Sequence, residues 1–174
     1  YACRQTGFAM LCETNPQEVM DLSPVAHLAT IEGKVPFINF FDGFRTSHEI
    51  QKIEKWDYAD LKEMCNMDAV AAFRAHALNP EHPAMRGSHE NGDVFFQHRE
   101  ACNTAYNELP AIVEKYMAKV NEKLGTNYDL FNYYGAEDAE RVIVAMGSVN
   151  DVAEEVIDYL TAKGEKVGLV KVRL

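Results

Sequence analysis

A β-α-β pattern occurs near each end of the chain, and these two units constrain the fold more than any other feature. In the first unit, Gly7–Glu13 is an apolar run of strand length, and Val35–Phe41 is a nearly continuous apolar strand of the kind buried on both faces of a parallel sheet. A helix is predicted between them, from an N-cap at Asn15 and a first turn at Pro16 to a stop at Gly33. Two parallel strands joined in this way require a right-handed crossover.

Two further residues shape the expectation for this helix. Glu18 lies three positions after Asn15, which is the spacing of a capping-box pair. Pro24 lies inside the predicted helix, where it removes a backbone hydrogen bond. We therefore expect the helix to be kinked or split at Pro24.

The second unit covers about residues 128–174. Arg141–Met146 is predicted to be a buried strand, Val149–Lys163 an amphipathic helix that stops at Gly164, and Val167–Val172 the next strand. The sequence therefore predicts an α/β fold with two partial doubly wound parallel-sheet domains, joined by a helical and irregular segment.

The joining segment, about residues 46–127, contains no repeat and no low-complexity tract. In chain order we expect helices over residues 57–64 and 68–78, a break at Asn79–Pro83, an exposed polar loop over 87–93, a helix resuming near Arg99, and a last helix from Pro110 to a stop at Gly125.

Composition excludes several classes of protein. The formal net charge of −10 argues against a nucleic-acid-binding protein, because phosphate contacts need clustered Lys and Arg. No apolar run approaches the roughly 20 residues of a membrane-spanning helix, and no signal peptide is visible. The four cysteines form no C-x-x-C pair, so we expect free thiols in a reducing cytoplasm.

The two ends of the chain lie within predicted structure. Tyr1 is followed closely by an apolar stretch, and Leu174 closes a run of strand character. We expect the sequence to be a piece of a longer polypeptide, since natural domains usually end in exposed polar residues.

The densest polar cluster follows the strand that ends at Phe41. It contains Asp42, Arg45, His48 and Glu49, at a position where parallel sheets gather ligand and interface residues. Asp42 could accept hydrogen bonds, Arg45 could hold a carboxylate or phosphate, and His48 could titrate near neutral pH. The alternative is structural, with Asp42 and Glu49 pairing with Arg45 to fix a loop or an interface.

Weaker signals occur elsewhere. Gly147-Ser148 precedes a helix whose free N–H groups could bind an anion, although ordinary strand-to-helix turn chemistry explains the pair equally simply. Cys3–Gly7 offers an Arg and a hydroxyl for phosphate contacts or for fixing a loop. The histidines show neither H-E-x-x-H nor H-x-x-E-H spacing, so no metal site is predicted.

Several longer runs carry a resemblance to a known family. They begin with Arg4–Leu11, Gln17–Asp21 and Val25–Ala29, and the most specific is Pro36-Phe37 with Phe40–Ile53. Further along are Asn79–Pro83, Arg86-Gly87, Gly135-Ala136, Asp138–Val144, Met146–Ser148 and Ala162–Leu174. On these residues the whole chain resembles the pyruvate:ferredoxin (flavodoxin) oxidoreductases. Ser23-Pro24 departs from the uninterrupted helix that we expect in that family.

The resemblance implies a domain organisation and a reaction. Residues 1–125 would be the C-terminal part of the domain that contacts the pyrimidine ring of thiamine diphosphate, with a helical linker, and residues 126–174 would begin a domain similar to the C-terminal domain of transketolases. The complete enzyme would use thiamine diphosphate with Mg2+ and 4Fe–4S clusters to oxidise pyruvate to acetyl-CoA and CO2, reducing ferredoxin or flavodoxin. A cytoplasmic homodimer is expected, with no nucleic-acid or membrane partner.

The resemblance also implies which parts are missing. The family's activating glutamate and its pyruvate-binding residues would lie before Tyr1, and the cluster cysteines after Leu174, so no catalytic residue is transferred to this chain and no cofactor is expected to be fully bound by it. The isolated chain is expected to be inactive. Two alternatives stay open, namely a 2-oxoacid:ferredoxin oxidoreductase with another substrate, and a non-catalytic α/β binding module.

Overall fold

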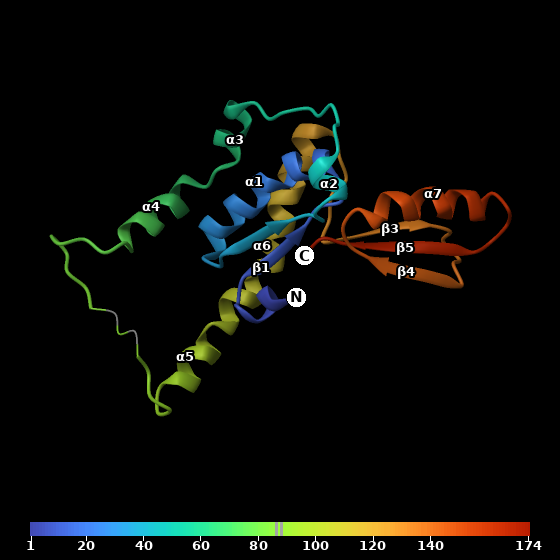
Figure 1. Ribbon diagram of the computed structural model, residues 1–174. Helices are drawn as coiled ribbons and strands as arrows, with labels where there is room; N and C mark the ends of the chain where they lie inside the picture. The colour runs from blue at the N-terminus through green and yellow to red at the C-terminus, as the bar shows by residue number, and fades with distance from the viewer. Residues whose placement is uncertain (86, 88) are drawn as a thin grey trace.

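The computed structural model describes residues 1–85, 87 and 89–174, so Arg86 and Ser88, within the predicted motif and polar loop, lie outside the described residues. Figure 1 shows a larger part, in which β1, β2, α1 and α6 pack together, beside a smaller part formed by β3, β4, β5 and α7. In chain order the elements are a 3-10 turn Ala2–Gln5, β1 Ala9–Cys12, α1 Pro16–Gly33, β2 Phe37–Phe40, α2 Arg45–His48, α3 Tyr58–Met64, α4 Met67–Ala75, α5 Phe95–Ala101, α6 Asn103–Leu124, β3 Phe131–Gly135, β4 Arg141–Ala145, α7 Val149–Thr161 and β5 Val167–Val172.

The first β-α-β unit is confirmed. Strands β1 and β2 are parallel, with Ala9 opposite Phe37 and Cys12 opposite Phe40, and α1 connects them. The expectation that the second strand is buried on both faces was wrong for this chain, because β2 pairs with β1 alone among the described strands and Asn39 is exposed.

Helix α1 begins as the sequence predicted. The side chain of Asn15 accepts a hydrogen bond from Glu18 N at 3.0 Å, and the carboxylate of Glu18 reaches back to Thr14 N at 2.9 Å. The helix continues through Gly33, and Lys34 forms its left-handed C-cap with φ 57°. Because the stop comes one residue later than predicted, the left-handed position falls on a lysine.

Pro24 lies inside α1 without splitting it, so a split of the helix at this residue was wrong. A residue at position 24 would normally donate its N–H to the carbonyl of Met20, four residues earlier, and proline has none to donate. The indole N–H of Trp56 donates to that carbonyl instead, at 2.9 Å. A side chain from a distant segment thus supplies the bond that proline removes.

Helices α1 and α6 form the main hydrophobic core. Leu22 and Val25 of α1 and Val113, Tyr116 and Val120 of α6 are all at most 1% exposed. The core side chains fix α6 against α1, and Tyr116 also donates its hydroxyl to Glu32 of α1 at 2.6 Å.

Helix α6 also begins earlier than the sequence predicted. It starts at Asn103 and includes Pro110, which is exposed. The loss of one helical bond is inexpensive there, because a carbonyl on an exposed face can bond to solvent. The stop at Gly125 is confirmed, with φ 69°.

Met64 of α3 is buried in this core, whereas α5 extends away from it (Figure 1). Helix α3 is capped by the side chain of Asp57, which accepts from Ala59 N, and α4 by that of Asn66, which accepts from Ala69 N. The predicted break at Asn79–Pro83 is confirmed, and an isolated bridge joins Asn79 to His82 there. Helix α5 then begins at Phe95, slightly before the predicted position near Arg99.

The second sheet has the order β3-β5-β4. Strands β4 and β5 are parallel, which confirms the second β-α-β unit, and β3 pairs with β5 in the antiparallel sense. The α/β class is therefore confirmed, but this sheet is mixed rather than purely parallel, because a strand that the sequence analysis missed adds to the far edge of β5.

Strand β4 is also more exposed than predicted. Val142, Ile143 and Val144 are between 46% and 68% exposed, because β4 is an edge strand of the second sheet. A continuous apolar run is typical of a strand buried on both faces. Among the described elements, however, α7 packs chiefly against β5 and β3.

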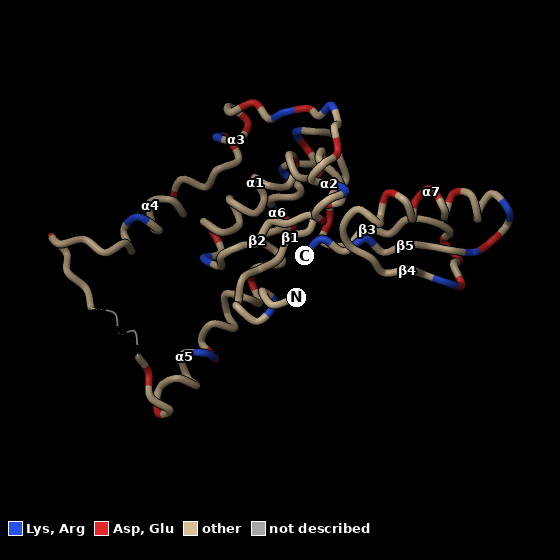
Figure 2. The backbone as a smooth tube through the Cα atoms, viewed as in Figure 1, with Lys and Arg blue, Asp and Glu red and all other residues tan. Residues whose placement is uncertain are grey.

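Charged residues of both signs are interspersed along the outer elements (Figure 2). Among the described residues, the structure contains no helix with the length and apolar character needed to span a membrane.

Candidate functional site

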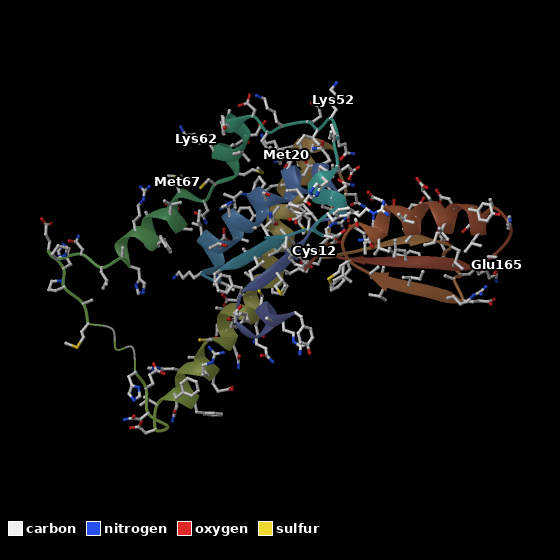
Figure 3. All side chains as sticks on the ribbon, in the orientation of Figure 1. Cys12, Met20, Lys52, Lys62, Met67 and Glu165 are labelled. Atoms are coloured by element: carbon white, nitrogen blue, oxygen red, sulfur yellow. The ribbon has the colours of Figure 1, made fainter. Side chains whose placement is uncertain are left out.

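The carboxyl ends of β1 and β2 meet the start of α7 and the end of β5, and this junction contains the predicted polar cluster. A backbone bond ties the two sheets together, because Cys12 N at the end of β1 donates to Arg173 O at 2.9 Å. Arg173 N in turn donates to Leu130 O, just before β3, at 2.9 Å. Figure 3 shows Cys12 where the first sheet meets the second. Side chains of the two sheets are therefore close neighbours at this point.

Asp42 connects the first sheet to α7. It follows β2, is half-buried, and both of its carboxylate oxygens accept from Ser148 N at 3.1 Å. A carboxylate at a helix N-terminus is favoured by the positive end of the helix dipole. The anion that could be expected at Gly147-Ser148 is thus a side chain of the chain itself.

The turn before α7 requires glycine. Gly147 has φ 79°, a left-handed conformation that favours glycine. A Cβ at this position would lie 2.3 Å from Oδ1 of Asp42. The carboxylate of Asp42 can therefore approach the backbone this closely only because residue 147 has no side chain.

The other three predicted site residues are exposed. Arg45 and His48 lie on the short helix α2, and Glu49 follows it. Oγ of Ser47 and Nδ1 of His48 are 3.0 Å apart. Among the described residues Arg45 forms no ion pair with Asp42 or Glu49, so the pairing that we considered as the structural alternative is not found.

Phe44 introduces this short helix in a strained conformation. Its φ is 63°, which is uncommon for a bulky residue, and its side chain is 80% exposed. Its ring lies 5.5 Å from that of His48, at a tilt of 44°. The loop after β2 therefore presents two aromatic rings and a guanidinium outward.

Two residues that the sequence analysis missed are buried in the junction. Glu13 directly follows β1 and is 0% exposed, and Asn150 of α7 is 1% exposed. Neither carboxylate oxygen of Glu13, nor Oδ1 of Asn150, has a hydrogen-bond partner among the described residues. Burial and the nearby Glu18 raise the pKa of Glu13 to about 8. The position of Glu13 at a strand end was visible in the sequence, but its lack of a partner was not.

Arg173 anchors the end of β5 to α1. It is 3% exposed and donates from Nη2 to Glu18 Oε1 at 2.8 Å, while Nη1 donates to Oδ1 of Asn132. Its guanidinium also lies over the ring of Tyr128, whose hydroxyl donates to Asp21 at 2.7 Å. These bonds join α1, the loop before β3 and the end of β5 into one buried polar network.

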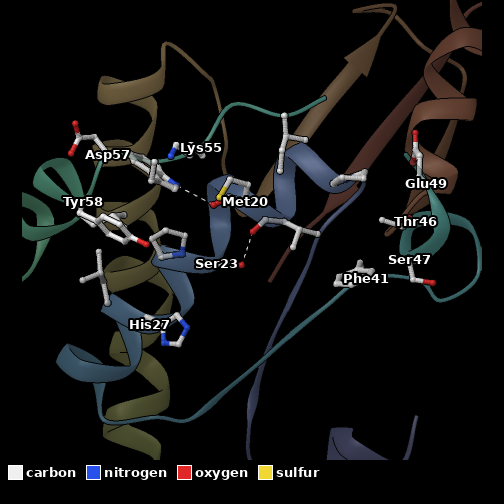
Figure 4. A pocket seen from close by; sticks show the side chains of 17 residues that line it. Met20, Ser23, His27, Phe41, Thr46, Ser47, Glu49, Lys55, Asp57 and Tyr58 are labelled. Carbon is white, nitrogen blue, oxygen red and sulfur yellow. Dashed lines mark hydrogen bonds between the residues drawn. The ribbon is translucent and has the colours of Figure 1, made fainter. Parts of the chain in front are cut away.

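Two clefts flank the loop after β2. The larger, of about 1140 Å3, lies between α1 and the segment that carries Trp56, and is mostly apolar (Figure 4). The smaller, of about 640 Å3, lies between α2 and the start of α7 and is lined in part by Arg45 and His48. Thr46 and Glu49 line both, and Oγ1 of the buried Thr46 has no partner among the described residues.

The weaker candidates form local contacts. Thr6 Oγ1 donates to Cys3 O at 2.6 Å, and Arg4 donates to the hydroxyl of Tyr1 at 2.7 Å, which fixes the turn before β1. Across the part of the chain that the structure describes, no group of three or more His, Cys, Asp or Glu side chains is placed to hold a metal ion.

Two models of known protein families match this chain. Residues 1–118 match the thiamine-diphosphate-binding domain of pyruvate flavodoxin/ferredoxin oxidoreductases, and residues 139–174 match core domain II of pyruvate:ferredoxin oxidoreductases. The first match alone covers more than half of the chain.

Curated relatives align over the whole chain. A pyruvate-flavodoxin oxidoreductase of Enterobacter agglomerans is 59% identical over 100% of this chain and 15% of its own length. A pyruvate:ferredoxin oxidoreductase of Moorella thermoacetica is 58% identical over 99% of the chain and 15% of its own length. A pyruvate dehydrogenase (NADP+) of Cryptosporidium parvum is 51% identical over 99% of the chain and 9% of its own length. The chain therefore spans about 15% of the length of the bacterial relatives, and it belongs to the pyruvate flavodoxin/ferredoxin oxidoreductase family.

Proposed function

We propose that this chain is part of an enzyme that decarboxylates pyruvate oxidatively, forms acetyl-CoA and CO2, and reduces ferredoxin or flavodoxin. The observation that carries the proposal is the identity of 59% along the entire chain with a pyruvate-flavodoxin oxidoreductase. The match to a thiamine-diphosphate-binding family model over residues 1–118 supports the same reaction class.

The chain's own role in that enzyme is structural support near the cofactor. We assign residues 1–125 to the C-terminal part of the pyrimidine-binding domain and residues 126–174 to the start of the next domain. The loop Asp42–Glu49 would then lie at their interface, facing the active-site cleft with Arg45 and His48. The bond from Ser148 N to Asp42, which crosses from one sheet to the other, supports this assignment.

The junction does not fit the diphosphate of the cofactor. The N-terminus of α7 already receives the carboxylate of Asp42, and that of α1 is capped by the side chains of Asn15 and Glu18. The buried side chains of Glu13 and Glu18 are acidic. A diphosphate requires positive charge or free N–H groups. We therefore assign no catalytic step through thiamine diphosphate to residues of this chain, and place Mg2+ and the 4Fe–4S clusters elsewhere in the complete enzyme.

The compartment and assembly are part of the same proposal. The four cysteines are free thiols, which suits a reducing cytoplasm. Coenzyme A as acyl acceptor and a homodimeric assembly follow from the family resemblance alone.

The reaction is tested in the complete protein under anoxic conditions. Reduction of ferredoxin should depend on both pyruvate and coenzyme A, and pyruvate should give a higher kcat/KM than 2-oxobutyrate or 2-oxoglutarate. A preference for another 2-oxoacid would move the enzyme to the alternative substrate class. An absence of turnover with every 2-oxoacid would favour the non-catalytic α/β module.

The role of the loop is tested by Arg45→Ala, with Lys52→Ala as the matched control, because Lys52 is exposed in the same segment and lines neither cleft. Arg45→Ala should lower pyruvate turnover and Lys52→Ala should not. Unchanged kinetics and stability in Arg45→Ala would reject both the cleft role and the interface role.

A further inference from the structure

Helix α7 covers one face of the second sheet and leaves the other face exposed (Figure 1). On the covered face, the hydroxyl of Tyr134 in β3 donates to Asp158 of α7 at 2.7 Å, and Lys171 of β5 donates to Glu154 of α7. Leu169 lies on the same face, two residues before Lys171, and is 0% exposed. These contacts identify the face on which α7 lies.

The opposite face carries apolar side chains. Side chains alternate along each strand, so the neighbours of the residues that meet α7 lie on the face away from it. In the register of the sheet these are Phe131 and Tyr133 of β3 and Val142 and Val144 of β4, with exposed fractions between 46% and 68%. The ring of Tyr133 lies across Gly168 of β5, in the space that a side chain at residue 168 would take. We call the surface formed by Phe131, Tyr133, Val142 and Val144 the bare face. A contiguous apolar surface of this kind marks an interface.

The outer edge of β4 is open as well. Strand β5 already has β4 on one side and the antiparallel β3 on the other, so among the described strands only β4 offers the parallel pair a free edge. Ile143, on the face of α7, is 56% exposed, so the apolar side chains of β4 are exposed on both faces. Strands with this pattern lie inside parallel sheets that helices cover on both faces. Strand β4 therefore has the sequence of an interior strand at an edge position.

The hand of parallel crossovers connects the open edge to the bare face. These crossovers are right-handed almost without exception, so the direction of the crossover across the sheet decides which face the connecting helix covers. The chain runs from β4 through α7 to β5 in one direction. A connection from β5 to a parallel strand beside β4 would run in the opposite direction. Its helix would then lie on the opposite face of the sheet, which is the bare face.

We propose that an amphipathic helix of the same polypeptide, outside residues 1–174, covers the bare face in the complete enzyme, and that a parallel strand connected to this helix pairs with the outer edge of β4. The bacterial relatives have ample chain for such an addition, because this chain spans 15% of their length. The proposal rests on the assignment of residues 126–174 to the start of a further domain, and it does not depend on the reaction. It places β4 in the interior of a doubly wound sheet.

Hydrogen exchange of the complete protein tests the added strand. An edge strand leaves about half of its N–H groups without a strand partner, whereas an interior strand bonds all of them. The matched control is β3, the other edge strand of the same sheet. Relative to the 174-residue chain, the amides of residues 141–145 should lose their fast-exchanging half, and those of residues 131–135 should keep it. Fast exchange that persists in β4 would overturn the proposal, and so would equal protection of β3, because general burial would then explain both.

A photo-crosslinking benzophenone side chain identifies what covers the bare face. In the complete protein it replaces Val144, and in the matched control it replaces the adjacent Ile143, which lies on the face of α7. Hybrids of unlabelled and isotope-labelled copies show by mass spectrometry from which copy a captured peptide comes. The probe at Val144 should capture a peptide of the same copy from outside residues 1–174, and the probe at Ile143 should not capture that peptide.

Capture of a peptide from residues 1–174, from a second copy, or of no peptide at all would overturn the proposal. If the protein with the probe does not fold, the hydrogen exchange of the unsubstituted protein decides alone. Neither measurement uses pyruvate turnover, so a protein that oxidises another substrate, or none, can still confirm the covered face and the paired edge.

Discussion

The contact between Trp56 and α1 gives a prediction that can be checked quantitatively. Pro24 leaves the carbonyl of Met20 without its helical donor, and the Trp56 indole donates to it at 2.9 Å (Figure 4). In Trp56→Phe the ring is largely kept and the donor is lost. The Met20 carbonyl, on a partly buried residue, would then have no protein donor, and we expect a loss of about 1–3 kcal/mol in the free energy of unfolding.

The dependence on Pro24 separates this explanation from simple loss of packing. In Pro24→Ala, residue 24 regains an N–H that can bond to the Met20 carbonyl within the helix. Pro24→Ala alone should stabilise the chain by about 2 kcal/mol. A proline in a helix interior costs about 3 kcal/mol, and its restriction of the unfolded chain offsets up to about 1 kcal/mol of that cost. In this background Trp56→Phe should cost about 1 kcal/mol less than in the original chain.

The assay is urea unfolding of the four chains of this double-mutant cycle, followed by far-UV circular dichroism. Fluorescence is unsuitable because Trp56 is the single tryptophan. A coupling energy below about 0.3 kcal/mol would show that the Trp56 indole does not replace the bond that Pro24 removes, since independent sites are additive within that range.

Three further predictions concern the junction and the core. Gly147→Ala should lower the free energy of unfolding in urea by about 1–3 kcal/mol, because it combines a left-handed φ with a Cβ 2.3 Å from a carboxylate oxygen of Asp42. Gly164→Ala should cost less, because Gly164 has a similar φ of 87° but open space around it. Equal losses in the two variants would show that the contact with Asp42 is not the cause. Arg173→Met should lower the free energy of unfolding by about 3–5 kcal/mol, because it leaves the charge of Glu18 buried and unpaired. The double variant with Glu18→Leu should recover most of that loss. A double variant as unstable as the single one would show that the unpaired charge is not the cause. The hydrogen bond from Lys115 is the main reason that the pKa of Glu32 is lowered from 4.5 to about 2. The stabilisation from Glu32 is therefore present above pH 4.5 and is lost as the pH falls through 2. Glu32→Gln should make the free energy of unfolding less dependent on pH in that window, and an unchanged dependence would exclude this contribution.

Local signals in the sequence predicted the helix ends and the crossovers. Asn15, Asp57 and Gly125 carry their caps within a few residues of chain, so pattern alone identifies them. Strand β3, Phe131–Gly135, was missed because it is short and its antiparallel partner lies more than thirty residues away. The continuity of α1 through Pro24 could not be predicted either, because it depends on a tryptophan far along the chain.

The candidate site was only partly visible in the sequence. A strand-end position identified Asp42 as a contact residue, but its partner, Ser148 N, lies in the second sheet. Glu13 looked like the last residue of a strand, and its complete burial depends on tertiary packing. Polar residues between two units depend on tertiary packing, which local pattern does not encode.

The proposal that this chain belongs to a pyruvate-oxidising enzyme is decided by product analysis of the complete protein. Incubated anoxically with carboxyl-labelled pyruvate, coenzyme A and ferredoxin, the protein should release labelled CO2 together with acetyl-CoA and reduced ferredoxin. Release of none of these products by an intact, cofactor-loaded protein would contradict the claim.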